Sequence, residues 1–231
     1  MSVNNPASLY LDIINKYIPT KEIAKIIDDY CNLAGVCKQT LIGHTCNISY
    51  LITLPNGDIV SGSWDKTIKI WNNGVCIRTL LGHTSNITCL MSLPNGDLVS
   101  GSCDFTIKIW RNWVCINTLF GHTSSIMKLT TLPNGDLVSE SYDRIKKIWR
   151  NNSVCIQTIQ EPEVWRTHGH RITLSNGDQA EETDEYTIEI WRNGICKQTL
   201  KGHTGYIFSL ITLPNGDLVS GSSDNTIKIW Q

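Results

Sequence analysis

The chain has 231 residues, of which 41% are hydrophobic and 18% charged, a composition that fits a globular protein and excludes collagenous, disordered and coiled-coil chains. Twenty Lys and Arg against 21 Asp and Glu leave a formal charge of -1, which predicts no binding to nucleic acid or to an anionic membrane. Because the sequence has neither a membrane-length apolar run nor a signal-peptide pattern, we expect an intracellular protein, cytoplasmic or nuclear. None of the nine cysteines forms a Cys-x-x-Cys pair, so we expect reduced thiols, no metal site and no cofactor.

Residues 1–34 differ in pattern from the rest of the chain. Apolar residues recur at helical spacing over 9–17 and 23–30, which predicts a short helical N-terminal segment. This segment also resembles the start of an F-box, the motif by which substrate receptors hold a cullin ubiquitin ligase adaptor. The likeness rests on Pro6, Leu9, Ile13, Tyr17, Ile18, Pro19, Glu22 and Ile23. A helical cap packed on the following domain explains the same residues without that partner.

A repeat organises residues 35–231. The turn sequence Pro-Asn-Gly-Asp, or once Ser-Asn-Gly-Asp, ends at Asp58, Asp97, Asp136, Asp178 and Asp217, with spacings of 39, 39, 42 and 39 residues. A tryptophan follows each of these aspartates after 13 residues. Such self-similarity at a fixed period is typical of repeat folds built from one stacked unit.

Each repeat predicts four short antiparallel strands. Period-two alternation, as at Ile68 and Ile70, indicates the third strand, and a nearly continuous apolar run such as 87–93 indicates a first strand buried on both faces. The run at 75–80 and its counterparts give the fourth strand. One such unit exposes two apolar faces, so the units must stack. We therefore predict an all-β fold, a five-bladed propeller of four-stranded blades.

The frame of the repeat predicts how the ends meet. A fourth-type strand at 36–41 precedes the first complete unit, whereas the last unit stops one residue after its third strand. Pairing 36–41 with 226–230 would complete the fifth blade and close the ring. An open fragment of a longer array is the alternative.

These residues resemble the WD-repeat (WD40) propeller family, whose repeats carry Gly-His before the first strand, Asp in a later turn and Trp at the close of the third strand. The Gly-His histidines are His44, His83, His122 and His203, and the turn aspartates are Asp65, Asp104, Asp143, Asp184 and Asp224. The closing pair is Trp-Asn or Trp-Arg where the family usually has Trp-Asp.

The resemblance also implies a buried hydrogen-bond chain in each blade, from Trp through Ser to His and Asp. The serines are Ser61, Ser100, Ser139 and Ser220, and the tryptophans are Trp71, Trp110, Trp149, Trp191 and Trp230. A Ser, His and Asp set could also suggest a hydrolase triad, but its recurrence at constant spacing favours a structural role.

The fourth repeat departs from this pattern. Glu161-Pro162 replaces Gly-His, and we expect Ala180 at the serine position, with Asp184 and Trp191 retained. Sequence drift and a specialised binding blade both explain these changes. His168 and His170 nearby have no third ligand in view, so they predict no metal site.

The resemblance further implies where partner proteins dock, because WD-repeat propellers use the face lined by the loops before the first strand and between the second and third. Carried over to this sequence, the partner-binding residues are Trp64, Asn86, Cys103, Met127, Tyr142, Arg166, Tyr206 and Phe208. Aromatic and Met side chains at such a rim are typical of protein-binding hot spots. Burial under neighbouring loops is the alternative.

A weaker likeness concerns the hairpins at 71–76 and 191–196 with the segment TIQEPEVW. They look similar to the propeller of the phospholipase-A-2-activating protein family, which implies ubiquitin as a partner.

The leading hypothesis is a non-enzymatic scaffold or adaptor that binds proteins, with a substrate-receptor or ubiquitin-binding role as the alternative. A structural assembly protein and a propeller hydrolase are further alternatives. Every recurrent aspartate has a structural duty, and the sequence has no phosphate loop or nucleophile elbow, which argues against the hydrolase.

Overall fold

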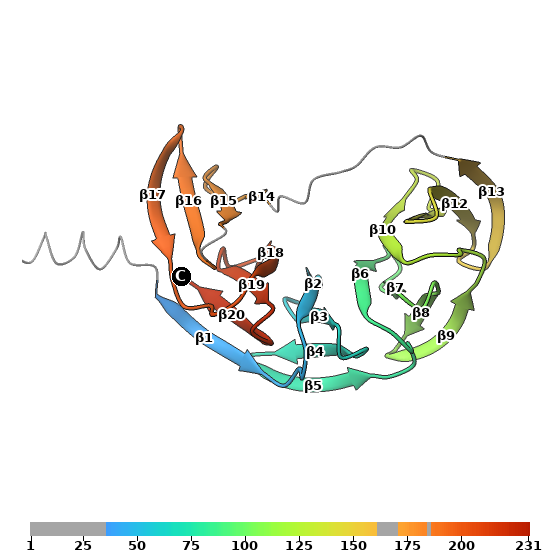
Figure 1. Cartoon of the computed structure of the whole chain (residues 1–231), viewed down its shortest axis with the longest axis horizontal. Coiled ribbons are helices and arrows are strands. Elements are labelled where there is room, and N and C mark those ends of the chain that lie inside the picture. Colours follow the sequence, from blue (N-terminus) through green and yellow to red (C-terminus); the bar gives the residue numbers. More distant parts are fainter. Residues whose placement is uncertain (1–35, 161–170, 184–185) are drawn as a thin grey trace, which may run out of the picture.

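The computed structural model describes residues 36–160, 171–183 and 186–231. In this part of the chain the regular structure is entirely β, with five four-stranded antiparallel sheets (Figure 1). No helix there is long and apolar enough to span a bilayer. The all-β, five-bladed propeller is therefore confirmed, whereas the helical segment predicted for 1–34 lies outside the described residues.

The blades follow one another in the sequence, and each has its strands in the spatial order first, second, third, fourth. The first blade contains β2 (Ile48–Thr53), β3 (Ile59–Ser63), β4 (Ile68–Asn72) and β5 (Val75–Leu80). The second contains β6 (Ile87–Ser92), β7 (Leu98–Ser102), β8 (Ile107–Arg111) and β9 (Val114–Leu119). The third contains β10 (Ile126–Thr131), β11 (Leu137–Ser141), β12 (Ile145–Arg150) and β13 (Val154–Gln160). The fourth contains β14 (Arg171–Thr173), β15 (Gln179–Glu182), β16 (Ile188–Arg192) and β17 (Ile195–Leu200).

The fifth blade joins the two ends of the described chain. It contains β18 (Ile207–Thr212), β19 (Leu218–Ser222) and β20 (Thr226–Trp230), and its outer strand is β1 (Cys37–Ile42). β1 pairs antiparallel with β20, with Leu41 opposite Ile227. The side chain of Leu41 is buried in the cluster between the fifth and first blades. The first blade-forming segment of the sequence thus supplies the strand that the last repeat lacks.

The recurrent turn sequence forms the hairpin between the first and second strands of each blade. In the first blade, the Leu54 amide donates a hydrogen bond to the Asp58 carbonyl (2.9 Å), and Gly57 has a φ of 86°. A positive φ is open to glycine without the clash that a Cβ atom causes, which explains the residue type. The Asn56 side chain also accepts a hydrogen bond from the Asp58 amide (3.1 Å).

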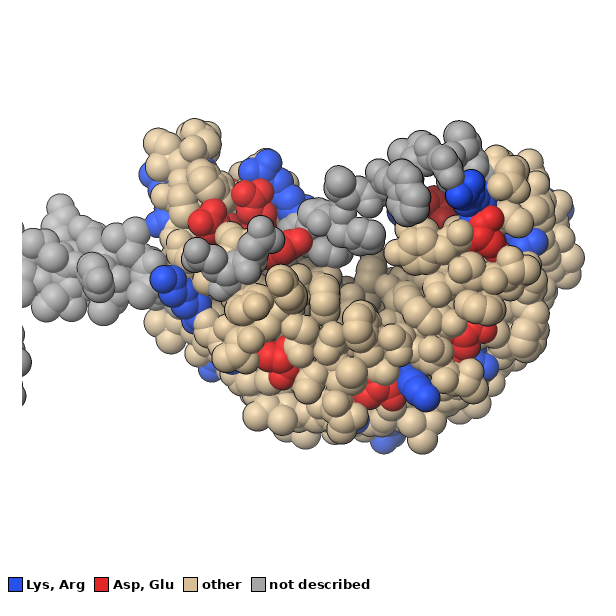
Figure 2. Space-filling view, viewed as in Figure 1, with Lys and Arg blue, Asp and Glu red and all other residues tan. Residues whose placement is uncertain are grey.

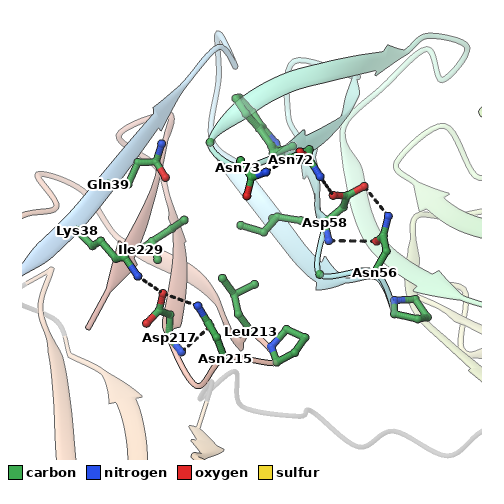
Figure 3. A pocket seen from close by; sticks show the side chains of 16 residues that line it. Lys38, Gln39, Asn56, Asp58, Asn72, Asn73, Leu213, Asn215, Asp217 and Ile229 are labelled. Atoms are coloured by element: carbon green, nitrogen blue, oxygen red, sulfur yellow. Dashed lines mark hydrogen bonds and ion pairs between the residues drawn. The ribbon is translucent and has the colours of Figure 1, made fainter.

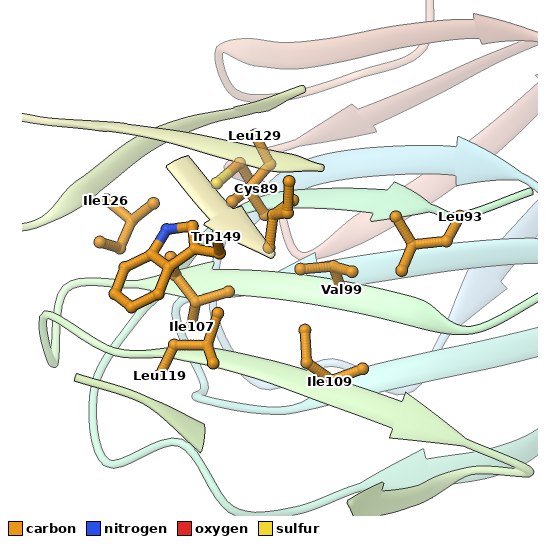
Figure 4. Packing of buried hydrophobic residues seen from close by; sticks show 10 residues of the cluster. Cys89, Leu93, Val99, Ile107, Ile109, Leu119, Ile126, Leu129 and Trp149 are labelled. Carbon is orange, nitrogen blue, oxygen red and sulfur yellow. The ribbon is translucent and has the colours of Figure 1, made fainter. Parts of the chain in front are cut away.

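Clusters of buried aliphatic residues hold neighbouring blades together. Figure 4 shows the cluster between the second and third blades, where Ile107, Ile109 and Leu119 meet Ile126, Leu129 and Trp149. Equivalent clusters fill the junctions between the first and second, fifth and first, and fourth and fifth blades. Burial of both faces explains why the inner strands are almost continuously apolar.

The described residues form no fifth cluster of this kind between the third and fourth blades, and the five sheets follow an arc (Figure 1). In the third blade, Glu140 and Lys146 lie opposite each other on neighbouring strands. The equivalent positions in the fifth blade hold Gly221 and Ile227. The Lys146 ammonium lies 3.4 Å from the Glu140 carboxylate. An ion pair thus replaces Gly221 and Ile227 at these two positions, while Val138 and Ile148 of the same face remain buried.

The facing side of the fourth blade has a matching change. Arg171 and Glu181 lie opposite each other on neighbouring strands. The equivalent positions in the fifth blade hold Leu210 and Ser220. The Arg171 guanidinium lies 2.9 Å from the Glu181 carboxylate. The expected closed ring therefore differs from the arc that the described residues form, and the physical reason is that charged residues replace apolar ones at these positions on both faces of the junction.

Candidate partner-binding surface

Four blades contain the same buried hydrogen-bond chain. In the second blade, the Trp110 indole donates to Ser100 Oγ (2.9 Å), which lies 2.8 Å from His83 Nε2, and His83 Nδ1 lies 2.7 Å from Asp104 Oδ2. The chains of the first, third and fifth blades have the same connections, with distances between 2.7 and 2.9 Å. Each polar group in these chains therefore has the partner that burial demands.

The buried hydrogen-bond chain of each blade has the connections of a catalytic triad, but a substrate has no access to it. In each of the four blades, His Nε2 faces Ser Oγ and His Nδ1 faces Asp, as in a serine hydrolase. However, the serine side chains of Ser61, Ser100, Ser139 and Ser220 are fully buried, and each Oγ already accepts the indole N–H. This arrangement stabilises a blade, and it leaves none of these four serines available as a nucleophile.

The turn aspartates are held as carboxylates. Burial on its own would raise the pKa of Asp104, but hydrogen bonds from His83, the Thr106 hydroxyl and the Thr84 amide outweigh it and hold this pKa below its usual range. The pKa values of Asp65, Asp143 and Asp224 are lowered in the same way. Burial lowers the pKa of His122, and its bond to Asp143 offsets this only in part.

The fourth blade lacks this chain, and its register corrects one of our assignments. Ala180 pairs with Ile190 as Val219 pairs with Ile229, so Ala180 occupies a core position rather than the serine position that we expected. Glu181 occupies the serine position instead. The Trp191 Nε1 atom is buried without a hydrogen-bond partner among the described residues, and Asp184 lies outside them.

The hydrogen-bond chains fix the loops that carry the predicted partner-binding residues. In the first blade, Asp65 Oδ2 accepts the Thr45 amide (3.1 Å), and Asp65 Oδ1 accepts the Thr67 amide (2.9 Å). The Trp64 amide, in the β3–β4 turn, donates to the Asn47 carbonyl at 2.9 Å. The buried chain thus anchors the turn from which the Trp64 side chain projects.

Two ring contacts join four aromatic residues of three blades into what we call the aromatic surface: Trp64, Tyr186, Tyr206 and Phe208. Trp64 of the first blade stacks on Phe208 of the fifth, with ring centroids 5.9 Å apart and planes 19° from parallel. Tyr206 of the fifth blade meets Tyr186 of the fourth edge to face, at 5.0 Å and 88°. Trp64 remains 41% exposed and Tyr206 55% exposed, so the surface is open to solvent.

The remaining predicted residues lie apart from these two ring contacts. Asn86 and Cys103 face each other in the second blade, where the Cys103 amide donates to the Asn86 carbonyl (2.9 Å), and both are half-buried. Met127 is half-buried in β10 of the third blade, and Tyr142 is exposed in the β11–β12 turn. Arg166 lies outside the described residues.

Sequence reasoning missed two aromatic residues of these turns. Phe105 and Tyr186 are in β3–β4-type turns of the second and fourth blades, where both have a positive φ, of 68° and 63°. Phe105 is 44% exposed. The signal is their place two residues before the third strand, next to a Thr, whereas the predicted partner-binding residues of these turns are the ones that precede the turn aspartate.

The described residues contain no group of three His, Cys, Asp or Glu side chains that could hold a metal ion. The cysteines in this part of the chain are all free thiols. His168, His170 and the F-box-like residues of 6–23 lie outside the described residues.

The chain matches the family model for the WD domain, G-beta repeat, at residues 35–72, 74–111, 113–150 and 194–231. These segments cover more than half of the chain and leave out most of the fourth blade. Among solved structures, the WD40 beta propeller domain of Doa1 is 31% identical, with a TM-score of 0.48. That match covers 83% of this chain and 66% of the other, so this chain spans just under two thirds of the Doa1 propeller chain. No curated protein matches the sequence.

Proposed function

The chain belongs to the WD-repeat family, and we propose that it is a non-enzymatic platform that binds partner proteins through the aromatic surface. The observation that carries this proposal is the pair of ring contacts, Trp64 on Phe208 and Tyr206 on Tyr186, across three blades. Aromatic side chains contribute most to protein–protein affinity when they are rigid and partly exposed at the centre of an interface.

The fixed backbone beneath this surface supports the proposal. A binding surface that is already ordered loses less conformational entropy when a partner docks. The loops below the aromatic rings are held by hydrogen bonds: the Trp64 amide donates to Asn47, and the Ser223 amide donates to the Tyr206 carbonyl at 2.8 Å. The rings therefore project from two turns that are tied to their own blades.

The proposal is tested by replacing Trp64, Tyr206 and Phe208 together with alanine and measuring which proteins the chain captures from a lysate by quantitative mass spectrometry. We expect the amounts of specifically captured proteins to fall by about tenfold or more, because hot-spot residues contribute about 2 kcal/mol or more each. A triple alanine variant at Val75, Val114 and Ile195 is the matched control, since these apolar residues are also exposed but lie on the outer strands β5, β9 and β17.

Both variants should keep the thermal unfolding midpoint within a few degrees of the parent chain, because the replaced side chains are partly exposed. An unchanged set of captured proteins in the Trp64, Tyr206 and Phe208 variant would contradict the proposed surface. An equal loss in the outer-strand control would show that capture depends on general apolar exposure.

A role in the ubiquitin pathway remains a prediction from the sequence. The same capture experiment with a chain that begins at Asn32 tests ligase binding by residues 1–31 separately from ubiquitin binding by the propeller. If a cullin-ligase adaptor is captured only by the full chain, residues 1–31 bind the ligase, whereas capture of identical proteins by both chains argues against it. Direct titration of both chains with free ubiquitin tests the propeller itself.

A further inference from the structure

A cation neutralises the hairpin aspartate at the end of the recurrent turn in four of the five blades. In the second blade, Arg111 binds Asp97 with two hydrogen bonds, Nε to Oδ1 at 2.9 Å and Nη2 to Oδ2 at 2.7 Å. Arg192 binds Asp178 in the same two-fold way in the fourth blade. In the third blade Arg150 lies 3.8 Å from Asp136, and in the fifth Lys38 lies 2.8 Å from Asp217.

The first blade lacks this cation. Asn72 stands where the second, third and fourth blades have arginine, directly after the tryptophan of the third strand. The Asp58 carboxylate accepts only amide N–H groups from described side chains: Asn72 Nδ2 at 2.5 Å and Asn56 Nδ2 at 2.8 Å. Asp58 is only 5% exposed, so it is a largely buried carboxylate with no cation beside it in the described structure.

A cavity of about 430 Å³ opens beside this aspartate, between the first and fifth blades (Figure 3). One wall carries Asp58, Asn56 and Asn72, and the other carries Asp217 with its Lys38. Ile59, Trp71, Leu213 and Ile229 also line the cavity and make part of it apolar. Its charged side chains are two carboxylates and one ammonium, which leaves one negative charge uncompensated.

A second difference from the neighbouring junction concerns the hairpin beside the cavity, where the Gln39 side chain lies against Gly74 at the place that a side chain on residue 74 would take. The β4–β5 hairpin of the first blade has Gly74 where the equivalent hairpin of the second blade has Trp113. The Trp113 side chain packs against the cluster between the first and second blades, whereas Gly74 has no side chain and lines the cavity. The first blade therefore lacks both the arginine and the bulky side chain that the second blade has at these positions.

We propose that this cavity binds the guanidinium group of an arginine side chain from a partner protein. The group would bind the Asp58 carboxylate as the arginines of the second and fourth blades bind theirs, with the two parallel hydrogen bonds seen between Arg111 and Asp97. It would share Asp58 Oδ1 with Asn72 Nδ2 or displace that amide from it. The apolar wall formed by Ile59, Trp71 and Ile229 suits the aliphatic stem of that arginine.

This site is distinct from the aromatic surface. Asp58 precedes β3 (Ile59–Ser63) and Trp64 follows it, so the two sites lie at opposite ends of one strand. A partner could therefore occupy one without covering the other, and the two proposals can fail independently.

The probe is a blocked Gly-Gly-Arg-Gly-Gly peptide, titrated into the isotopically labelled full chain while the backbone amide signals are followed by NMR. We expect saturable shifts at residues 56–58 and 72–74 that weaken with added salt, and no such shifts with the isosteric citrulline peptide, which carries no charge. Shifts of equal size with both peptides, or none with the arginine peptide, would overturn the proposal.

The decisive variant is Asn72→Arg, which supplies from the chain itself the cation that the site lacks. It should raise the unfolding midpoint slightly and weaken peptide binding by about tenfold or more, because the guanidinium position becomes occupied. Because this variant completes an ion pair found in the other blades, loss of binding through misfolding is easily distinguished. Unchanged peptide affinity would place the peptide elsewhere and contradict the proposal.

The second blade offers the reciprocal test. The double variant Arg111→Asn with Trp113→Gly gives it the two residues that the first blade has at these positions. We expect a second set of saturable shifts, at residues 95–97 and 111–113. A single set of shifts in the folded double variant would show that these two differences do not create the site and would overturn the argument from the neighbouring blade.

Discussion

The hydroxyl of Ser100 serves two buried groups at once, since it accepts the indole N–H of Trp110 and meets the imidazole of His83. One oxygen atom thereby satisfies an indole and an imidazole that have no access to water. A buried donor or acceptor left unpaired costs about 1–3 kcal/mol, which makes this small side chain important to the blade. The same holds for Ser61, Ser139 and Ser220.

Replacing Ser100 with alanine should therefore lower the free energy of unfolding by about 2–4 kcal/mol, measured by urea denaturation. Glu181→Ala is the control, because Glu181 occupies the equivalent strand position in the fourth blade but forms a partly exposed ion pair with Arg171. Such a pair contributes about 1 kcal/mol or less. An equal loss of unfolding free energy in both variants would show that the buried hydrogen-bond chain adds no stability beyond what any residue at this strand position contributes.

The turn aspartates predict a marked loss of stability in acid. Folding lowers the pKa of Asp65, Asp104, Asp143 and Asp224, so each contributes stability above its unfolded pKa of about 3.9 and loses it as the pH falls toward the folded pKa. Folding also lowers the pKa of His122, so protonation of this histidine in the unfolded chain reduces stability as the pH falls below about 6.5.

We therefore expect the free energy of unfolding to decline gently below about pH 6.5 and more steeply below about pH 4. Urea titrations across this range measure it. Asp104→Asn should make the steep part shallower, because one of the four carboxylates no longer binds a proton on unfolding. A flat profile between pH 6 and 3 would contradict these pKa directions.

At the scale of elements, β1 completes a sheet whose other strands come from the far end of the chain. Its one buried residue is Leu41, which is 2% exposed and lies in the cluster between the fifth and first blades, while the next residue, Ile42, is 77% exposed. The hydrogen-bonded register with β20 fixes which of the two side chains enters the core.

Leu41→Ala should lower the free energy of unfolding by about 2–5 kcal/mol, as expected for a buried leucine, and Leu119→Ala in β9 should cost about the same. Ile42→Ala, the exposed neighbour, should change it by less than about 0.5 kcal/mol. Differential scanning calorimetry and urea denaturation measure the stability of the three variants. A small effect of Leu41→Ala beside a large effect of Leu119→Ala would show that β1 adds little to the fifth blade.

The sequence predicted the elements well where the repeat was regular. Each Asn-Gly turn and each alternating run gave a strand in the expected place, because hairpin turns and period-two burial are local properties. In the fourth repeat the serine position was placed one residue too early, at Ala180 instead of Glu181. The intact turn sequence holds the right count, because the serine follows the hairpin aspartate by three residues in the other four repeats and Glu181 follows Asp178 by three. Pairing with β16 gives the same register.

At the scale of the whole molecule, the arc ends in two faces that carry ion pairs, Glu140 with Lys146 and Arg171 with Glu181. Charged side chains make each of these faces more polar where no other described blade covers it, and an exposed apolar face tends to associate with another. The four junctions that are packed have aliphatic clusters in their place.

Glu140→Gly with Lys146→Ile gives the third blade the residues of the fifth at these positions. We expect this double variant to self-associate, with an apparent mass above that of the monomer in size-exclusion chromatography with light scattering. The control is Glu140→Gln with Lys146→Gln, which removes the charges but leaves the face polar. A monomeric double variant with a higher unfolding midpoint would instead show that the third and fourth blades pack together.

The sequence by itself determined the number of blades, their strands and the turns that carry aromatic residues, since all of these repeat locally at a fixed period, and the resemblance to the WD-repeat family implied the buried hydrogen-bond chains. Only the tertiary structure decided which turns meet. Trp64 and Phe208 are far apart in the chain, and so are the turns that hold Asp58 and Asp217 on the two walls of the cavity. The pairing of the fifth blade with the first brings each pair together, and that packing depends on apolar surfaces buried between blades rather than on any residue pattern within one repeat.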